Sequence, residues 1–260
     1  EPLRKRNPFV NPDDPAQDIH RRARAYLHVN CAHCHRFGGG GTAVFDLRHE
    51  LSDADTKLFS TLPIQGTFDI EHARVVAHGD PAASMLFYRM AKLGPGRMPH
   101  FGARSVDSKG LALLAEWIHS LPRDDSPGQL NGQGPVDLRQ RQAHSITRFR
   151  RANDPFSPAA REAIDDLLSR TSGGIQLLMA TEGLQFGLPV GHRRAAIDTA
   201  LGHSDSRIRD LFLQYIPEDQ RQPTIGLTTD GASILERTGN VEAGKTLVEN
   251  HAGLRCLECH

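Results

Sequence analysis

The sequence has no long apolar run and no excess of charge of either sign. No stretch approaches the roughly 20 consecutive apolar residues that a bilayer-spanning helix needs. The 31 Lys and Arg residues are balanced by 31 Asp and Glu residues, so no overall charge steers the molecule toward nucleic acid or an anionic membrane. We therefore predict no transmembrane segment and no nucleic-acid partner, and we expect electrostatic docking to depend on local patches.

The sequence also has no apolar leader. It begins at Glu1, and residues 1–14, which are rich in Pro, Asn and Asp, are expected to be extended. Such a start is typical of a processed mature protein or of a piece of a longer one.

Cysteine is scarce, with four residues in 260, but all four stand in one pattern. Cys-x-x-Cys-His occupies residues 31–35 and again residues 256–260, although only 14 of the 260 residues are His. A zinc site would have to join two pairs more than 200 residues apart and would leave both His unexplained. A thioredoxin-like dithiol would follow a strand, whereas the residues before the first motif have a helical pattern. A disulfide within such a pair is strained and rarely stabilises a fold.

The remaining interpretation is covalent attachment of haem. Two thiols two residues apart can add to the two vinyl groups of one haem, while the adjacent imidazole binds the iron from the same side. We therefore predict haem c bound to Cys31 and Cys34, with His35 as iron ligand. A second haem c is predicted at Cys256 and Cys259, with His260 as its iron ligand.

The residues before and after the first motif predict a helix and a loop. A helix is predicted from Asp14 to Asn30, because Asp14 can cap it, Pro15 suits the first helical position and Gln17 completes a capping box. The four glycines at 38–41 predict a loop near the haem edge. We interpret this loop as a solvated turn rather than a phosphate cradle, because no Lys-Ser/Thr follows it.

Two further helices complete a predicted first domain over residues 15–122. One is predicted over residues 80–93, with Met85 and Met90 in the core, and the other over residues 107–121. Residues 123–135, rich in Gly and Pro, are predicted to be a linker.

The predicted second domain, residues 136–222, again has a helical pattern. Its helices are expected to begin at Ser157 and to span residues 175–181, 193–201 and 205–215, in antiparallel hairpins. Arg207, Arg209 and Asp210 are interpreted as surface ion pairs.

Residues 223–260 are predicted to be the N-terminal part of a third domain. Here Asn240 caps a helix over residues 241–250 that leads to the second motif, as the first predicted helix leads to the first motif.

The sixth ligand of the first iron has one main candidate. Met98 stands in an irregular loop before Pro99, which lacks an amide donor and disfavours helical geometry at Met98. His100 or His78 would instead give a bis-His haem of lower potential. For the second haem, His251 is a weak local candidate.

These features resemble a class I cytochrome c domain: a helix, CxxCH, a Met-Pro loop and a terminal helix with a Trp-Ile pair, over residues 15–122. Residues 22–35, 79–84, 97–99 and 116–118 more narrowly resemble the haem domain of planctomycete-type multidomain, multi-haem cytochromes. Residues from about 159 onward, including 208–212 and 244–247, resemble the helical-repeat segment and following haem domain of related proteins. The resemblance implies His35 and Met98 as axial ligands.

The predicted molecule is mostly α: a class I cytochrome c domain, a helical-repeat-like linker domain and the start of a second cytochrome c domain. We expect one-electron transfer rather than enzymatic activity, with redox proteins or neighbouring subunits as partners, in the periplasm or another extracytoplasmic compartment. Because the second motif ends the sequence, we expect the chain to continue or a neighbouring subunit to cover this haem. The alternatives are a di-haem peroxidase-like enzyme and the electron-accepting domain of a dehydrogenase.

Overall fold

The computed structural model describes residues 9–100, 104–122, 135–221, 232, 235–236 and 238–250. Within it, the chain divides into two compact units, residues 1–217 and 218–260. The prediction of a mostly helical protein is confirmed, and the described residues contain no strand, only an isolated bridge between Arg74 and Ser84.

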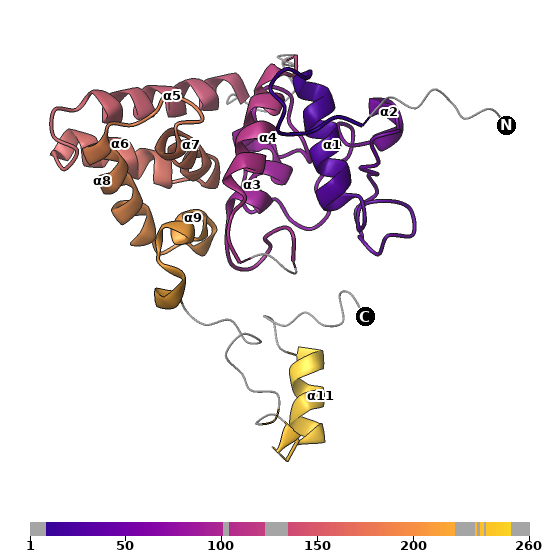
Figure 1. Ribbon diagram of the computed structural model, residues 1–260. Coiled ribbons are helices and arrows are strands. Elements are labelled where there is room, and N and C mark those ends of the chain that lie inside the picture. The colour runs from indigo at the N-terminus through magenta and orange to yellow at the C-terminus, as the bar shows by residue number, and fades with distance from the viewer. Residues whose placement is uncertain are drawn as a thin grey trace. The chain divides into compact units, whose positions relative to one another are not determined.

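The first unit contains eleven helical elements among its described residues (Figure 1). They are α1 (Ile19–Cys31), α2 (Asp53–Thr56), η1 (Pro81–Ala83), α3 (Met85–Ala91), α4 (Ser108–Ser120), α5 (Pro135–Arg151), α6 (Pro158–Leu168), α7 (Thr171–Glu182), α8 (Val190–Leu201), α9 (Ser206–Phe212) and η2 (Leu213–Tyr215). The second unit contains η3 (Glu218–Gln220) and α11 (Val241–Asn250). No helix of the described residues has both the length and the apolar character needed to cross a bilayer.

Helix α1 begins later than predicted. The Asp18 side chain accepts a hydrogen bond from the amide of Arg21 and caps the helix, so the predicted start at Asp14 is wrong. Asp14 instead forms a turn of its own, in which its carboxylate accepts from the amide of Ala16 and the side chain of Gln17. Both aspartates are good caps, and only the path of the backbone decides between them.

Helices α1 and α4 lie side by side and cross closely (Figure 1). At Gly110 of α4, an added Cβ would lie 2.1 Å from the hydroxyl oxygen of Tyr26 on α1, so only glycine fits. The same hydroxyl donates a hydrogen bond of 2.8 Å to Asp107, the N-cap of α4. Trp117 of α4 is fully buried, and its indole N–H donates to Nδ1 of His20. This crossing fixes α1, whose last residue begins the first CxxCH motif.

The single helix predicted over residues 80–93 is two elements. Asp80 caps the short η1, and Ser84 then has extended backbone before α3 begins. The Ser84 hydroxyl donates to the carbonyl of Asp80 and accepts from the amide of Ala77, so it replaces the helical hydrogen bonding at this point. Met85 is buried in the core as predicted, and Met90 packs against it.

Helices α5–α9 pack as helical hairpins, as predicted (Figure 1). Ser157 caps α6 through a hydrogen bond from the amide of Ala160, and Pro158 occupies its first turn. Helix α7 is longer than predicted and is buried along almost its whole length. The predicted helix at 205–215 appears as α9 followed by η2.

A buried ion pair joins α9 to the segment after α3. Lys92 Nζ lies 3.2 Å from Asp210 Oδ2, and only 2% of the Lys92 side chain and 7% of the Asp210 side chain are exposed. The amide of Leu93 donates to the carbonyl of Asp210, and Tyr88 donates to the carbonyl of Arg207. The prediction that Asp210 forms a surface ion pair is therefore wrong, because packing of α9 on the first domain excludes water from it. Residues 15–122 and 136–217 consequently fall within one compact unit.

In the second unit, α11 confirms the helix predicted over residues 241–250. The Asn240 side chain accepts a hydrogen bond from the amide of Ala243, as predicted for a cap. The predicted ligands Cys256, Cys259 and His260, and His251, lie outside the described residues, as does most of the predicted linker.

Candidate haem site

The first CxxCH motif continues α1 by one turn. Cys31 is the last residue of the helix, and its carbonyl accepts hydrogen bonds from the amides of Cys34 (3.1 Å) and His35 (2.9 Å). Both thiols are free; Cys31 is half-buried and Cys34 is exposed. The helix and its terminal turn therefore present the two thiols and the imidazole from one short stretch of backbone.

The Cys31 thiol is held in its protonated form at neutral pH. Burial, and secondarily the neighbouring Cys34, raise the pKa of Cys31 to about 12. An SH group in this state is a poor nucleophile and a poor metal ligand unless a reaction partner or a dedicated attachment system takes its proton.

Neighbouring residues hold both the ring and the backbone of His35. The ring stacks on Phe45 with ring centroids 4.8 Å apart and an interplanar angle of 18°. The backbone carbonyl of His35 accepts a hydrogen bond of 2.8 Å from the amide of the buried Leu47. Within the described residues, Nδ1 of His35 is buried and has no hydrogen-bond partner. Leaving such an atom unsatisfied costs about 1–3 kcal/mol, so this imidazole is suited to a partner that none of the described residues supplies.

The environment of His35 favours the neutral imidazole, which is the form that binds metals. Burial is the main cause of a lowered pKa of His35, and the positive charges of His100, His33 and Arg89 lower it further. These causes also locate His100 and Arg89 near His35, although both follow it by more than 50 residues.

The glycine run after the motif packs against it. The amide of Gly41 donates to the carbonyl of Cys34 at 3.0 Å. A Cβ on Gly39 would lie 2.6 Å from that carbonyl oxygen, and a Cβ on Gly41 would lie 2.7 Å from it and 3.3 Å from Nδ1 of His35. The predicted loop is confirmed, but it is a close cover of the motif and not merely a solvated turn. The sequence did not predict this role, because a run of glycines has no side chains that indicate which residues it will pack against.

Met98 lies in a loop that Arg89 holds in place. The Arg89 guanidinium donates to the carbonyls of Gly96 and Gln65, each at 2.9 Å, and its own carbonyl accepts from the amide of Met98 at 2.9 Å. Gly96 has φ +79° and an added Cβ there would lie 2.6 Å from the ring of Phe68, so the loop depends on a glycine. Arg89 and His100 both lower the pKa of His35 and therefore lie near it. The half-buried Met98 stands between these two residues in the chain, so it belongs to the same region.

The two histidines that compete with Met98 differ in their surroundings. Nδ1 of His78 lies 3.0 Å from the carbonyl of Pro122, and its ring packs edge-on against Phe59. His100 is exposed and is an electrostatic neighbour of His35. Of the two, His100 is the one whose charge lowers the pKa of His35.

Large apolar side chains are exposed around the motif. They are Phe37 (97% exposed), Val44 (65%), Leu62 (56%) and Ile64 (59%). A hydrogen bond of 3.2 Å from Gln65 to Thr42 ties the 61–65 segment to the 37–44 segment, so these side chains belong to neighbouring loops. Such a group of exposed apolar side chains, on loops that follow the CxxCH motif, is typical of a binding surface.

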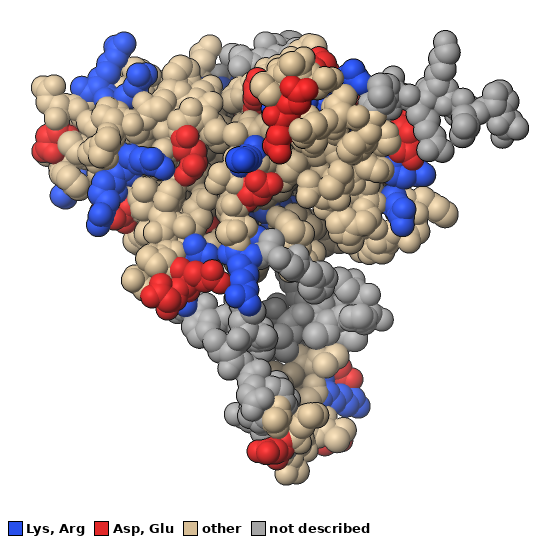
Figure 2. All heavy atoms as spheres, viewed as in Figure 1, with Lys and Arg blue, Asp and Glu red and all other residues tan. Residues whose placement is uncertain are grey.

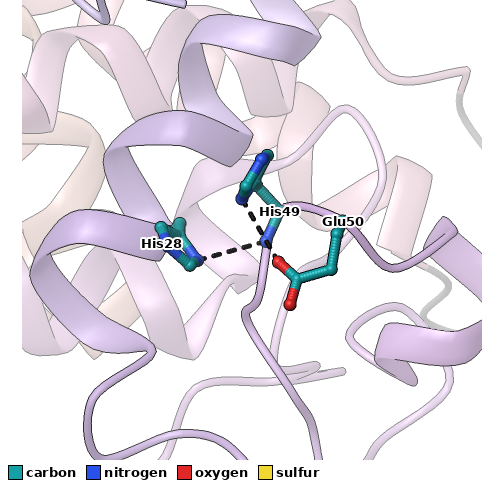
Figure 3. Close-up of side chains that lie close together, drawn as sticks. All are labelled: His28, His49 and Glu50. Atoms are coloured by element: carbon teal, nitrogen blue, oxygen red, sulfur yellow. Dashed lines mark hydrogen bonds and ion pairs between the residues drawn. The ribbon is translucent and has the colours of Figure 1, made fainter. Parts of the chain in front are cut away.

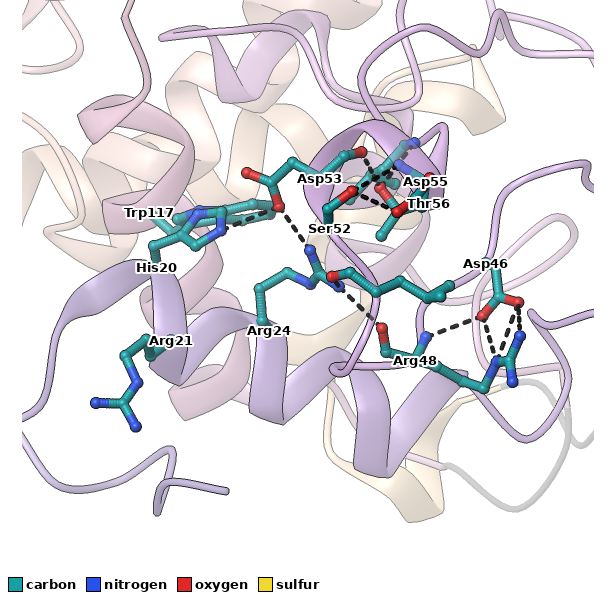
Figure 4. A network of polar contacts seen from close by, with 12 residues as sticks. His20, Arg21, Arg24, Asp46, Arg48, Ser52, Asp53, Asp55, Thr56 and Trp117 are labelled. Carbon is teal, nitrogen blue, oxygen red and sulfur yellow. Dashed lines mark hydrogen bonds and ion pairs between the residues drawn. The ribbon is translucent and has the colours of Figure 1, made fainter. Parts of the chain in front are cut away.

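A polar network fixes the loop that follows the motif onto α1 (Figure 4). The buried Arg24 donates to Asp53 and to the carbonyls of Arg48 and Leu51. Asp53 also contacts His20, which accepts from Trp117 of α4. The chain from α4 through α1 to the 48–53 loop is therefore continuous, and it positions the motif without involving the motif's own side chains.

No protein-family model, curated protein or solved structure matches this chain. The functional assignment therefore depends on the residues and their geometry.

Proposed function

We propose that this chain is a c-type cytochrome that transfers single electrons and is not itself an enzyme. Haem c is attached through thioether bonds to Cys31 and Cys34, and its iron is bound by His35 and Met98. A second haem is attached at Cys256 and Cys259 with His260 as ligand. Haem iron, when bound, supplies an Fe(III)/Fe(II) couple that accepts and releases one electron.

One observation above all carries the proposal: the stacked imidazole of His35 has a buried Nδ1 without a hydrogen-bond partner among the described residues, in the same five-residue motif as two free thiols. The neutral state favoured by its lowered pKa suits iron binding. The exposed apolar side chains Phe37, Val44, Leu62 and Ile64 suit an apolar macrocycle, because covering them would remove their contact with water.

The packing of the helices also supports a class I cytochrome domain over residues 15–122. In that proposal, α1 is the helix before CxxCH and α4 is the terminal helix with the Trp-Ile pair, and the two cross closely at Gly110 and Tyr26. The Met98 loop lies between α3 and α4, as the resemblance implies. The proposal extends to a helical-repeat-like segment over residues 136–222 and a further cytochrome domain from residue 223.

Under this proposal, the residues around the motif position the two iron ligands, His35 and Met98. Phe45 orients the His35 ring by stacking, and Gly41 leaves room at Nδ1. Arg89 holds the backbone of Met98 so that the thioether remains beside the motif. The fixed ligands reduce the rearrangement that accompanies a change of iron charge, which favours a carrier.

Partners are proposed to be redox proteins or neighbouring subunits, in the periplasm or another extracytoplasmic compartment, where haem c is attached in bacteria. On the face of the first unit seen in Figure 2, Lys and Arg side chains are interspersed with Asp and Glu. Docking would therefore use local complementarity and the apolar group near the motif rather than a field of one sign.

The decisive experiment is expression in cells that can mature c-type cytochromes. The purified chain is expected to be coloured, to exceed its polypeptide mass by one haem per intact motif, and to give an alkaline pyridine spectrum of the c type. A variant with both Cys31→Ser and Cys34→Ser should lose one haem equivalent, whereas His144→Ala, at an exposed position of α5, should lose none. A colourless wild-type protein would overturn the proposal.

The ligand assignment is tested separately. Met98→Ala should abolish the sulfur-to-iron absorption band of the oxidised protein, and His100→Ala should leave it unchanged. If the wild-type protein lacks this band and the low-temperature magnetic signal of its bis-His iron is lost in His100→Ala, His100 is the sixth ligand and the Met98 assignment is wrong.

A further inference from the structure

A second group of potential ligands, independent of the proposed haem site, lies between α1 and the loop that follows the motif. It consists of His28 on α1 and of His49 and Glu50 (Figure 3). One ligand atom from each residue can be chosen so that all three lie within 4.8 Å of one another. We call these three residues the His28 cluster.

Independent contacts hold the cluster together. The amide of His49 donates to the Nδ1 lone pair of His28 at 3.3 Å, a hydrogen bond that brings the two residues together and is given up when the His28 ring binds an ion. Nδ1 of His49 lies 3.2 Å from Oε2 of Glu50. The buried Arg24, one turn before His28, binds the carbonyls of Arg48 and Leu51 on either side of the two loop ligands (Figure 4). The loop therefore approaches α1 because of Arg24, and the three ligand side chains converge as a result.

Aromatic packing restricts both imidazoles. The His28 and His49 rings meet edge to face, with centroids 4.6 Å apart, and Phe9 packs against them at 5.6 Å and 4.9 Å respectively. Both histidines are half-buried. Aromatic packing of this kind reduces the number of rotamers that the two imidazole rings can adopt, and hence the conformational entropy that they lose when they bind an ion. His49 and Phe9 also line a cavity of about 220 Å³, so the His49 imidazole is accessible to water.

The charges around Glu50 leave its carboxylate able to bind a cation. Arg48, the nearest guanidinium, forms a forked contact with Asp46 through hydrogen bonds of 2.8–3.1 Å. Its distance to Oε1 of Glu50 is 3.9 Å, at the outer limit of an ion pair. Glu50 itself is exposed, so the carboxylate can rotate toward the imidazoles at little cost.

From these observations we infer that the His28 cluster binds one borderline divalent transition-metal ion, Zn²⁺ or Cu²⁺, through two imidazole nitrogens and one carboxylate oxygen. This donor set suits these ions rather than Mg²⁺ or Ca²⁺, which prefer oxygen ligands. Bond lengths of about 2.0–2.2 Å bring tetrahedral ligand atoms to roughly 3.4 Å apart, so the cluster needs only a small closure. The bound ion cross-links α1 to the 48–50 loop, one turn before Cys31.

The test uses the full chain with its haem, if present, and Zn²⁺ as the probe. After removal of metals with a chelator, wild-type protein is titrated with Zn²⁺ in competition with a chromophoric indicator whose absorption is separate from that of haem. We expect one tight equivalent. His49→Ala and Glu50→Gln should each weaken this equivalent by at least about tenfold, which is the smallest loss expected even for a residue that only supports a metal ligand.

The matched controls are His144→Ala on α5 and Glu116→Gln on α4, which remove an exposed imidazole and an exposed carboxylate elsewhere. Both should retain the tight equivalent. In addition, excess Zn²⁺ should raise the melting temperature of the wild type and of the controls but not of the two cluster variants. The melting curves also show whether a variant has simply failed to fold.

A second readout identifies the ligands directly. With one equivalent of Cu²⁺, the low-temperature magnetic spectrum of the wild type should show hyperfine structure from two nitrogens, and that of His49→Ala from one. Equal Zn²⁺ affinity in the wild type and both cluster variants, or an unchanged nitrogen pattern, would overturn the inference. Both measurements are made on haem-loaded protein or, if no haem is attached, after alkylation of the four thiols, because free CxxC thiols would themselves bind Zn²⁺ and Cu²⁺.

Discussion

The two halves of the first unit differ in how their helices are connected. In residues 9–122, long segments without helix, 32–52 and 57–80, separate α1, α2 and η1. In residues 135–217, by contrast, the helices follow one another after connections of a few residues, and α7 is almost completely buried by its neighbours. Long irregular loops are uncommon in compact domains unless they have a function. We therefore expect the functional site in the long loops of the loop-rich half, whereas the helical half is held together by contacts between its own helices.

The largest effect should come from removing the attachment of the proposed cofactor. In Cys31→Ser with Cys34→Ser, we expect complete loss of the first haem and loss of amide protection over residues 32–80, because the loops lose the group that they cover. Exchange in α6 and α7 should change much less. Hydrogen exchange with mass spectrometry measures both halves in one experiment.

The control for this variant is His33→Ala, which changes an exposed residue inside the same motif and keeps both thiols. It should retain haem and the exchange rates of the wild type. If both halves lose protection equally in the double variant, the contrast between them is wrong.

The next effect tests the contact between the halves. Lys92→Met leaves Asp210 buried without its partner and should lower the free energy of unfolding by about 3–5 kcal/mol. Denaturant titration measures the loss. Lys109→Met, at an exposed position of α4, should cost less than about 0.5 kcal/mol. If Lys92→Met together with Asp210→Leu is no more stable than Lys92→Met alone, the loss does not come from the unpaired charge.

A smaller effect is expected at the crossing of α1 and α4. Gly110→Ala places a Cβ against the Tyr26 hydroxyl and should cost about 1–3 kcal/mol through overpacking, measured by thermal unfolding. In a Tyr26→Phe background the same change should cost less. The comparison in the helical half is Gly191→Ala on α8, where the added Cβ would meet only Pro155 at 3.8 Å. A destabilisation of Gly191→Ala equal to that of Gly110→Ala would contradict the close-crossing argument.

The smallest effect concerns pH. Burial by itself would raise the pKa of Glu71, but hydrogen bonds from Arg170, its own backbone amide and Ser172 outweigh burial and lower the pKa below its ordinary value of 4.5. A lowered carboxyl pKa contributes stability that is fully present above that ordinary value and is lost as the pH falls through the folded-state value. Glu71→Gln should therefore reduce stability at pH 7 by less than about 1 kcal/mol, since Arg170 is partly exposed, and should reduce the loss of stability below pH 4.5. Denaturant midpoints at pH 7 and pH 3.5 test this; an identical acid loss in the variant contradicts it.

Much of the helical pattern could be predicted from local sequence. Ser157 and Asn240 cap the helices whose starts they were expected to mark, and Asp205 caps the helix predicted to begin there, because a cap needs only its own side chain and the next three amides. Local sequence could not choose between Asp14 and Asp18 as the start of α1. It also could not predict the interruption at Ser84, which depends on a hydrogen bond with Ala77 on another segment.

The sequence alone determined the chemistry that this protein can offer: two CxxCH motifs, and a helix leading into each, because thiol spacing and helix periodicity are properties of neighbouring residues. Only the tertiary structure decided what surrounds that chemistry. Phe45 on the His35 ring, the burial of Asp210 against Lys92, and the meeting of His28 with His49 all join residues distant in the chain. Such contacts follow from the packing of whole segments, and no local pattern encodes which segments will meet.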